Sequence, residues 1–336
     1  MSLHHPVVQW LLPIPLLAAL LWIAWRFFRT TWAELDAEAR AWNADLAARG
    51  EVDRRPLAVL VIGLFVLAWH EYFGGHAFYG EVVRRWLLGL GPFQRGGAFP
   101  LATWDGWLGQ AWWALTRVAG YLLPLALWPR LFPADRLRDL GLRVAGFREH
   151  AWIYALCVAV VVPAAVVASR QPDFGGYYPF YPDAGRSWLD LALWEAVYLA
   201  QFFALEVFFR GWWLRASRSL GASAIFFMTV PYAMIHYGKP WLEVHGAVVA
   251  GVVLGSLSAR TRSVWAGFLV HSTIALLMDL LVLSRRGQLP LRLAPGSDAT
   301  FVFEGWGLLL ALAWGAAVAV VAVELRRRIR ARSTRG

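Results

Sequence analysis

The chain has 336 residues, of which 59% are hydrophobic and only 16% are charged. A soluble domain is typically about 45–50% apolar and about 25% charged, so the composition excludes a disordered, a collagen-like and an ordinary soluble protein. The net charge is +10, but every basic residue except Lys239 is an arginine, and these lie scattered between apolar runs. That distribution argues against a nucleic-acid partner. The single cysteine, Cys157, excludes an intrachain disulfide and a cysteine-based metal site.

Apolar runs of membrane-spanning length follow one another along the whole chain. A bilayer core about 30 Å thick is crossed by about 20 mostly apolar helical residues. The run at 245–259 is short and rich in glycine, so as a span it needs neighbouring helices to cover it. We therefore expect an all-α fold, a polytopic integral membrane helix bundle of about 8–9 transmembrane helices. The candidate spans are 6–28, 56–73, 107–128, 150–169, 188–213, 220–237, 245–259, 263–283 and 305–325.

The basic residues indicate the orientation of these helices. With the N-terminus outside, the inside loops hold 21 arginines and the outside loops hold nine basic residues. Basic side chains concentrate on the cytoplasmic side of a membrane, so we expect the N-terminus out and the C-terminus in. The tail from Arg326 to Arg335 suits anionic lipid headgroups. The preference for Arg over Lys, with abundant Ala, Gly and Trp, suggests a GC-rich bacterium and hence a bacterial inner membrane.

The chain divides by composition into three parts. Residues 1–132 hold N-terminal transmembrane helices and loops. Residues 133–283 form the core that contains the candidate site residues, and 284–336 supply a C-terminal helix and the basic tail. Segment 30–49 is rich in alanine with mixed charges and predicts a helix on the inner face. Segment 133–149 alternates Arg with Leu or Val at helical spacing, which predicts a helix along the inner interface.

Four ionisable residues stand out within the predicted spans, where charge costs a few kcal/mol or more: Glu206, Arg210, His236 and His271. Glu206 and Arg210 are four residues apart and share one helix face, so they can pair. Counted from the same side of the membrane at about 1.5 Å per residue, Glu206, His236 and His271 lie at depths of roughly 18, 22 and 13 Å. Three helices therefore bring an acid and two imidazoles to similar levels.

Each of these residues also has a purely structural interpretation. Glu206 and Arg210 can form a structural ion pair, and a membrane histidine is often a packing residue that is hydrogen-bonded; the shared depth favours a common site. Asp279 shares a helix face with His271 and is either its partner or a helix-end residue. Glu243, at the start of the seventh span, either enters the site or faces water.

The four residues suit hydrolysis by activated water. An ionised glutamate accepts a proton from water, one imidazole holds that water, and a second imidazole donates to the oxyanion that forms. The same atoms can bind zinc, whose catalytic sites often use two His and one Glu. The chain contains neither HExxH nor GxSxG. We therefore expect no cofactor and no metal, with zinc at the Glu/His site as the alternative.

Three short motifs resemble the CPBP family of intramembrane proteases, which includes CAAX prenyl endopeptidases and Abi-like proteins. The first motif, Glu-Glu-x-x-x-Arg, corresponds to LEVFFRG at 205–211. The second, an aromatic residue followed four positions later by His, corresponds to YAMIH at 232–236. The third, a His followed four positions later by a small polar residue, corresponds to HSTIA at 271–275. The resemblance extends over about 133–283, which includes the GLR at 141–143.

The resemblance implies a role for each matching residue. Glu206 and His236 would position and deprotonate water, His271 would stabilise the oxyanion, and Arg210 would orient the acid, without metal. Two positions depart from the family pattern. Leu205 replaces the first glutamate, and the third motif ends in Ala275. The GKPWLE segment at 238–243 resembles a family branch with a single glutamate in its first motif, in which Glu243 supplies the second carboxylate.

The predicted function is intramembrane cleavage of a membrane-associated or lipid-modified protein by Glu/His-activated water. The expected partners are this substrate and the lipid bilayer, with no nucleic acid. A catalytically inactive relative that binds such substrates, or that partners a protease, is the alternative, because Leu205 removes the usual acid. A proton-coupled transporter is a third hypothesis, but the two halves of the chain show no inverted repeat.

Overall fold

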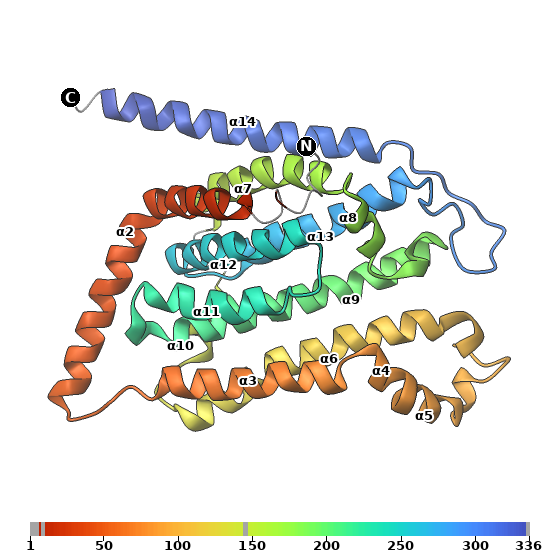
Figure 1. Cartoon of the computed structure of the whole chain (residues 1–336), viewed down its shortest axis with the longest axis horizontal. Coiled ribbons are helices and arrows are strands. Elements are labelled where there is room, and N and C mark those ends of the chain that lie inside the picture. The colour runs from red at the N-terminus through yellow and green to blue at the C-terminus, as the bar shows by residue number, and fades with distance from the viewer. Residues whose placement is uncertain (1–6, 8–10, 144–146, 334–336) are drawn as a thin grey trace. The chain divides into compact units, whose positions relative to one another are not determined.

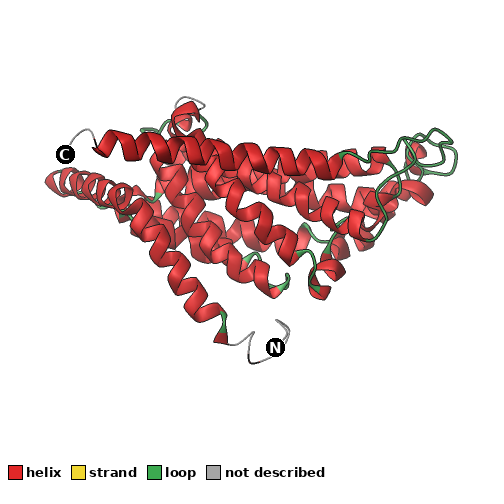
Figure 2. Cartoon of the chain, turned by 90° about the horizontal axis from the view of Figure 1, so that it is seen from above, coloured by secondary structure: helices red, strands yellow, loops and turns green. Residues whose placement is uncertain are grey.

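The computed structural model describes the chain except residues 1–6, 8–10, 144–146 and 334–336. Its described residues form helices and loops with no β-strand; the only extended pairings among them are two isolated bridges (Figure 2). This confirms the predicted all-α class. Helices satisfy every backbone hydrogen bond within one segment, which is what an apolar chain in lipid requires.

Six of the nine predicted spans are confirmed as helices long and apolar enough to cross a membrane. The outer helix α14 leaves its apolar window unburied within the molecule, so its leucine and valine side chains are suited to lipid. The six are α3 (Arg55–Phe73), α7 (Phe147–Ala168), the run α9 (Trp188–Glu206), η5 (Val207–Trp213) and α10 (Leu214–Ala216), α12 (Trp241–Thr261), α13 (Trp265–Arg285) and α14 (Trp306–Ser333).

The other three predicted spans have different boundaries in the structure. Segment 220–237 holds the shorter helix α11 (Ser223–Met234), which ends before Gly238 takes a φ of 85° and Pro240 follows. Segment 107–128 lies in the longer α6 (Leu101–Leu131), and the described part of 6–28 lies in α2 (Pro13–Ala48). Trp, Pro and Arg lower the hydropathy of α2 and α6, so their membrane crossing stays a prediction.

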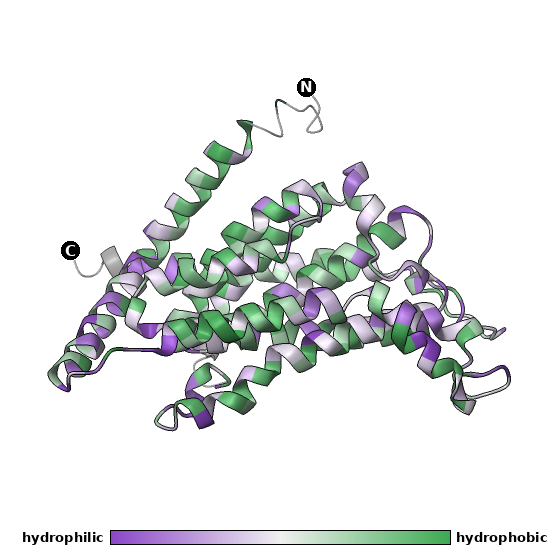
Figure 3. Cartoon of the chain, turned by 60° about the horizontal axis from the view of Figure 1, so that its bottom comes forward, coloured by the Kyte–Doolittle hydropathy of each residue, from purple (hydrophilic) through white to green (hydrophobic). Residues whose placement is uncertain are grey.

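The predicted inner-face helix 30–49 is not a separate element. It continues the first predicted span without a break, as the second half of α2. Figure 3 shows α2 changing along its length from mostly hydrophobic near the N-terminus to a mixture of hydrophobic and hydrophilic residues. The sequence indicated two helices because composition changes there, but no Gly or Pro interrupts the chain between Pro15 and Gly50.

The chain forms two compact units, each made from three separate stretches. Unit 1 comprises Met1–Trp69, Ala119–Val144 and Ala204–Gly267, and unit 2 comprises His70–Val118, Ala145–Phe203 and Phe268–Gly336. The short elements complete them. Unit 1 also contains η3 (Leu137–Leu140) and η6 (Arg218–Leu220); unit 2 also contains α4 (His76–Phe78), η1 (Tyr79–Val83), α5 (Arg84–Leu88), η2 (Gly91–Phe93), α8 (Pro172–Tyr177) and η4 (Pro182–Gly185).

In unit 1, α12 packs against α11 and α2 (Figure 1). The contact with α2 contains Ala24, Ile225 and Val252, all buried. Polar groups add direction to this apolar contact. Trp32 Nε1 donates to Ser256 Oγ at 2.9 Å, so α2 has one fixed position along α12.

In unit 2, aromatic side chains pack around α9. Trp194 and Tyr198 stack with ring centroids 4.5 Å apart, and Phe180 stacks on both. Elsewhere in this unit α14 lies along α7, as Figure 1 shows. The three-part division predicted by composition remains a prediction, because the two compact units follow spatial contacts rather than chain order.

Candidate active site

The first candidate pair lies where α9 passes into η5. Arg210 Nη1 lies 3.0 Å from Glu206 Oε1, and both side chains are fully buried. The guanidinium also lies over the Tyr232 ring, 3.8 Å from its centroid, in a cation–π contact. Removing one member of a buried ion pair leaves an uncompensated charge, so the two residues depend on each other in this apolar helix.

The helix is a π-helix directly after Glu206. Element η5 spans Val207–Trp213, and all seven of its side chains are buried. π-Helical turns are rare and occur frequently at functional sites. Neighbouring residues of an α-helix differ in direction by about 100°, so a carboxylate at Glu206 cannot point where one at Leu205 would. Arg210 lies four residues after Glu206 and pairs with it, and the π-turn changes the helical register of the residues that follow.

Gly267 lies against the carboxylate of Glu206. A Cβ atom added to Gly267 would overlap Glu206 Oε2. The absence of a side chain therefore lets the backbone at the start of α13 approach the acid. His271 follows Gly267 by four residues on α13, so helical periodicity places both on one face of that helix.

His236 follows α11 in a turn and is buried. Its Nδ1 lies 2.8 Å from the carbonyl oxygen of Tyr232, and the two rings are 4.8 Å apart between centroids. A carbonyl oxygen only accepts hydrogen bonds, so Nδ1 carries the proton in this contact. In the neutral tautomer with Nδ1 protonated, Nε2 is the hydrogen-bond acceptor of the ring, the kind of group that can orient a water molecule.

Glu243 lies in the first turn of α12 and is partly buried. Its Oε1 accepts a hydrogen bond from Lys239 Nζ at 2.7 Å, and the side chains of the pair are about one-fifth exposed. The Lys239–Glu243 pair and the Glu206–Arg210 pair both belong to unit 1.

In unit 2, His271 is buried against an aromatic ring. Its ring centroid lies 4.2 Å from that of Phe202. Further along α13, Asp279 Oδ2 accepts a hydrogen bond from Trp194 Nε1 at 2.8 Å. The charge of Asp279 acts on Glu195, whose two carboxylate oxygens are buried without a hydrogen-bond partner. Unit 2 thus contains a second buried acidic site.

The predicted site residues therefore fall in two groups. Glu206, Arg210, His236 and Glu243 belong to unit 1, whereas His271 belongs to unit 2. Their meeting at one cavity stays a prediction, as does the role of each residue.

Comparison with known families adds a second kind of observation. Residues 187–277 match the family model described as Rce1-like, type II CAAX prenyl endopeptidase Rce1-like. This segment is similar to that family over 91 residues. Proteins of this family are CAAX-type intramembrane proteases, so the resemblance predicted from the three motifs is confirmed. No curated protein and no solved structure was found to match the chain.

The Rce1-like segment contains every predicted site residue, including the departure at Leu205. Leu205 is buried, and Phe208 packs its ring 5.0 Å from that of Tyr121 on α6. Phe208 also contacts Trp212 and Trp213. The aromatic residues that follow Glu206 thus serve the packing of η5 against α6.

The geometry of the Rce1-like segment does not by itself indicate a metal site. Within the part of the chain that the structure describes, no group of three or more His, Cys, Asp or Glu side chains is arranged to hold a metal ion. The donors that zinc would use at the predicted site are Glu206, His236 and His271, and zinc there remains the alternative.

Sequence reasoning missed three contributors to the Rce1-like segment. Gly267 had no signal of its own, because its role depends on how closely α13 approaches Glu206. Tyr232 begins the second motif, and its spacing of four from His236 was the only sign of its contacts. Lys239, the only lysine, lies four residues before Glu243, and this helical spacing was a sign of their ion pair.

Proposed function

We propose that this integral membrane protein is an endopeptidase that hydrolyses a peptide bond of a membrane-associated or lipid-modified protein. The observation that carries the proposal is the fully buried Glu206–Arg210 pair at a π-helix within the Rce1-like segment. Intramembrane charges are rare and mark functional sites. The orientation with the N-terminus out, in a bacterial inner membrane, is part of the proposal and is supported by the arginine distribution.

In the proposed reaction, Glu206 acts as general base. It accepts one proton from water while the water oxygen attacks the scissile carbonyl carbon. Nε2 of His236 accepts the other water hydrogen and orients the molecule. His271 donates to the carbonyl oxygen as that oxygen becomes negative. When the C–N bond breaks, Glu206 returns its proton to the leaving amine, and Arg210 holds the carboxylate throughout.

Glu243 is the alternative base. Its carboxylate would have to separate from Lys239 before it could accept a proton from water. We propose a mechanism without metal, supported by the absence of HExxH and of cysteine ligands near the site. Metal analysis of the purified protein is expected to give far less than one zinc per chain, with activity that survives chelators. Stoichiometric zinc lost in His236→Ala would contradict this mechanism.

A catalytically inactive, substrate-binding protein is the second candidate function. It is favoured by one observation, the leucine at position 205 where the family has its first glutamate. An inactive protein has no requirement for a base, so its function should tolerate loss of the Glu206 carboxylate as long as the fold remains.

Membrane proteomics of cells that lack the gene tests the proposal. One protein should keep its terminal segment in these cells and lose it when the wild-type chain is restored. Glu206→Gln should not restore processing, while Glu304→Gln, a matched change at an exposed acid, should. If every protein is processed identically with and without the gene, the protein does not cleave in those cells.

A further inference from the structure

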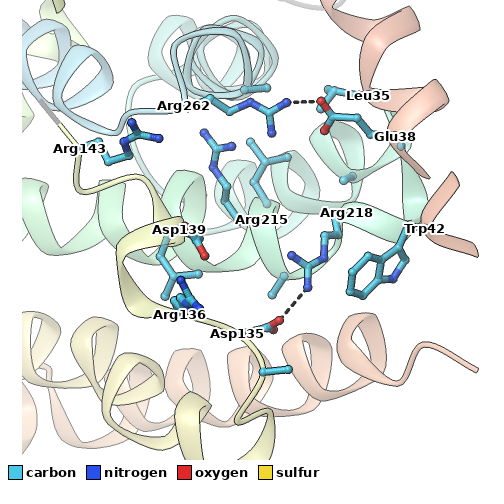
Figure 4. A pocket seen from close by; sticks show the side chains of 17 residues that line it. Leu35, Glu38, Trp42, Asp135, Arg136, Asp139, Arg143, Arg215, Arg218 and Arg262 are labelled. Carbon is cyan, nitrogen blue, oxygen red and sulfur yellow. Dashed lines mark hydrogen bonds and ion pairs between the residues drawn. The ribbon is translucent and has the colours of Figure 1, made fainter. Parts of the chain in front are cut away.

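A cavity of about 580 Å³ lies in unit 1, away from the Glu206–Arg210 pair. It is formed by the second half of α2, the loop around η3, the region from α10 to the start of α11, and the end of α12 (Figure 4). Ligand sites typically occupy cavities of about 300–1,000 Å³. Its size therefore suits a small ligand or a lipid headgroup.

The charged lining of this cavity is unbalanced. Five arginines and three carboxylates line it. Arg262 pairs with Glu38, and Arg218 pairs with Asp135 at 2.7 Å, as Figure 4 shows. Asp135 also accepts from Arg55, which lies outside the lining, at 2.9 Å. The third carboxylate, Asp139, lies 4.0 Å from Arg138, which is also outside the lining, so all three carboxylates already have an arginine partner.

Three arginines of the lining have no carboxylate partner among the described residues: Arg136, Arg143 and Arg215. Arg215 is partly buried. Its Nη2 donates to the carbonyl oxygen of Ser258 at 2.8 Å, while its Nε is buried without a hydrogen-bond partner. A buried donor that stays unsatisfied costs about 1–3 kcal/mol, so this guanidinium is suited to an acceptor supplied by a ligand.

The loop that carries Arg143 is held in place by the backbone of unit 1. The amide of Val264 donates to the carbonyl oxygen of Gly141 at 2.9 Å, and Ser263 Oγ donates to that of Arg143 at 2.7 Å. The opposite wall is fixed as well, because Arg218 lies over the Trp42 ring at 3.9 Å. A backbone held in this way favours binding, since less conformational entropy is lost when the loop orders around a ligand.

We propose that this cavity binds the phosphate of an anionic phospholipid headgroup. Guanidinium groups bind phosphate oxygens in bidentate fashion and are preferred for this chemistry. Leucine and alanine side chains between the arginines suit the glycerol and upper acyl parts of a lipid. All five arginines lie between the predicted spans, on the side that the charge distribution assigns to the inside, where anionic lipids are exposed to proteins.

Binding of short-chain lipids to the purified full-length protein in detergent tests this site. Dihexanoyl phosphatidylglycerol should raise the melting temperature in a saturable manner. Arg136→Gln/Arg143→Gln should weaken its affinity roughly tenfold or more, because two charge-assisted contacts are lost. Both side chains are exposed, so the fold should persist, and the melting temperature without lipid checks this.

The matched control is Arg54→Gln/Arg130→Gln, which removes two exposed charges outside the lining. It should bind phosphatidylglycerol like the wild type. Glycerol 3-phosphate distinguishes the source of the phosphate. A lipid-only response supports a headgroup site, and an equal response to glycerol 3-phosphate supports the same site for a soluble phosphate ester. Equal affinity of both double variants, or equal binding of zwitterionic phosphatidylcholine, would overturn the proposal.

Discussion

Two glutamates on α9 are buried in contrasting electrostatic surroundings. Glu206 has a guanidinium 3.0 Å away, and that cation in turn lies over an aromatic ring. Glu195, eleven residues earlier, has Asp279 as its charged neighbour, and its oxygens accept no hydrogen bond. Opposite charges favour an ionised acid, whereas a second acid beside the first disfavours it. Both glutamates are buried, so burial does not distinguish the candidate base Glu206 from Glu195. The nearby cation of Arg210 does.

The largest expected difference between the two acids is in substrate processing. Loss of a general base typically lowers the rate by about 10²–10⁴. Glu206→Gln should therefore abolish cleavage per molecule of folded protein, a basis needed because the change leaves Arg210 buried without its partner, whereas Glu195→Gln should leave the rate close to that of the wild type. Rates are measured on the substrate found by proteomics. Equal rates in the two variants would remove the distinction between the sites.

The next effect concerns stability and the counter-charge itself. Arg210→Met leaves Glu206 buried without its cation, which should cost about 3–5 kcal/mol. Melting of the purified variant in detergent checks this loss. The double variant Glu206→Gln/Arg210→Met removes both charges and should recover most of the stability. If the double variant is as unstable as Arg210→Met, packing of the arginine, rather than its charge, stabilises this region.

A smaller effect is expected from moving the Glu206 carboxylate without changing any charge. Gly267→Ala adds a Cβ that overlaps Glu206 Oε2 and displaces it. A shift of about 1 Å can lower an enzyme rate about 10²-fold. Gly246→Ala is the matched control, because a Cβ there meets no atom within 4 Å. Normal cleavage by Gly267→Ala would show that the position of Glu206 is not critical.

A third acid, outside the predicted spans, extends the comparison to a paired carboxylate near water. Burial acts to raise the pKa of Asp135, but hydrogen bonds from Arg55 and Trp128 and the charge of Arg218 outweigh it and lower the pKa. Asp135→Asn should cost about 1–3 kcal/mol at neutral pH.

The pH dependence of this effect has a definite sign. Because folding lowers the pKa of Asp135, its contribution is complete above the unfolded-state value of about 3.9 and is lost as the pH falls through the lower folded value. The stability difference between wild type and Asp135→Asn should be constant from about pH 7 to 5 and shrink below about pH 4. A difference that is unchanged at acid pH would mean that the ionised form is not the stabilising one.

Much of the helical fold could be predicted because membrane-spanning length is a local property of the sequence. Six predicted spans are helices of suitable length. The predicted helix over 133–149 is wrong for residues 133–143. The chain there forms only η3, Gly141 follows at a φ of 85°, and Leu142 bridges to Ser263; residues 144–146 lie outside the described residues, and α7 begins at Phe147. This conformation depends on pairing with a distant loop, which helical spacing does not show.

In the candidate site, too, contacts between residues close in sequence could be predicted, and contacts between distant residues could not. The Glu206–Arg210 pair was predictable, because a spacing of four places two side chains on one helix face. The approach of Gly267 to Glu206 joins residues 61 positions apart, and a glycine at the start of an apolar helix gives no sign of it. The π-helix was not predictable either, because its sequence, VFFRGWW, has ordinary apolar helical composition.

The π-helix can also be regarded as an insertion. A π-turn holds one residue more than the α-turn it replaces, so the span Trp188–Ala216 is one residue longer than an α-helix with the same number of turns. Removing one residue between Val207 and Trp213 would keep the span helical but rotate Arg215 by about 100° relative to Glu206. The length of this one turn therefore sets the direction in which the arginine-lined cavity faces relative to the buried acid.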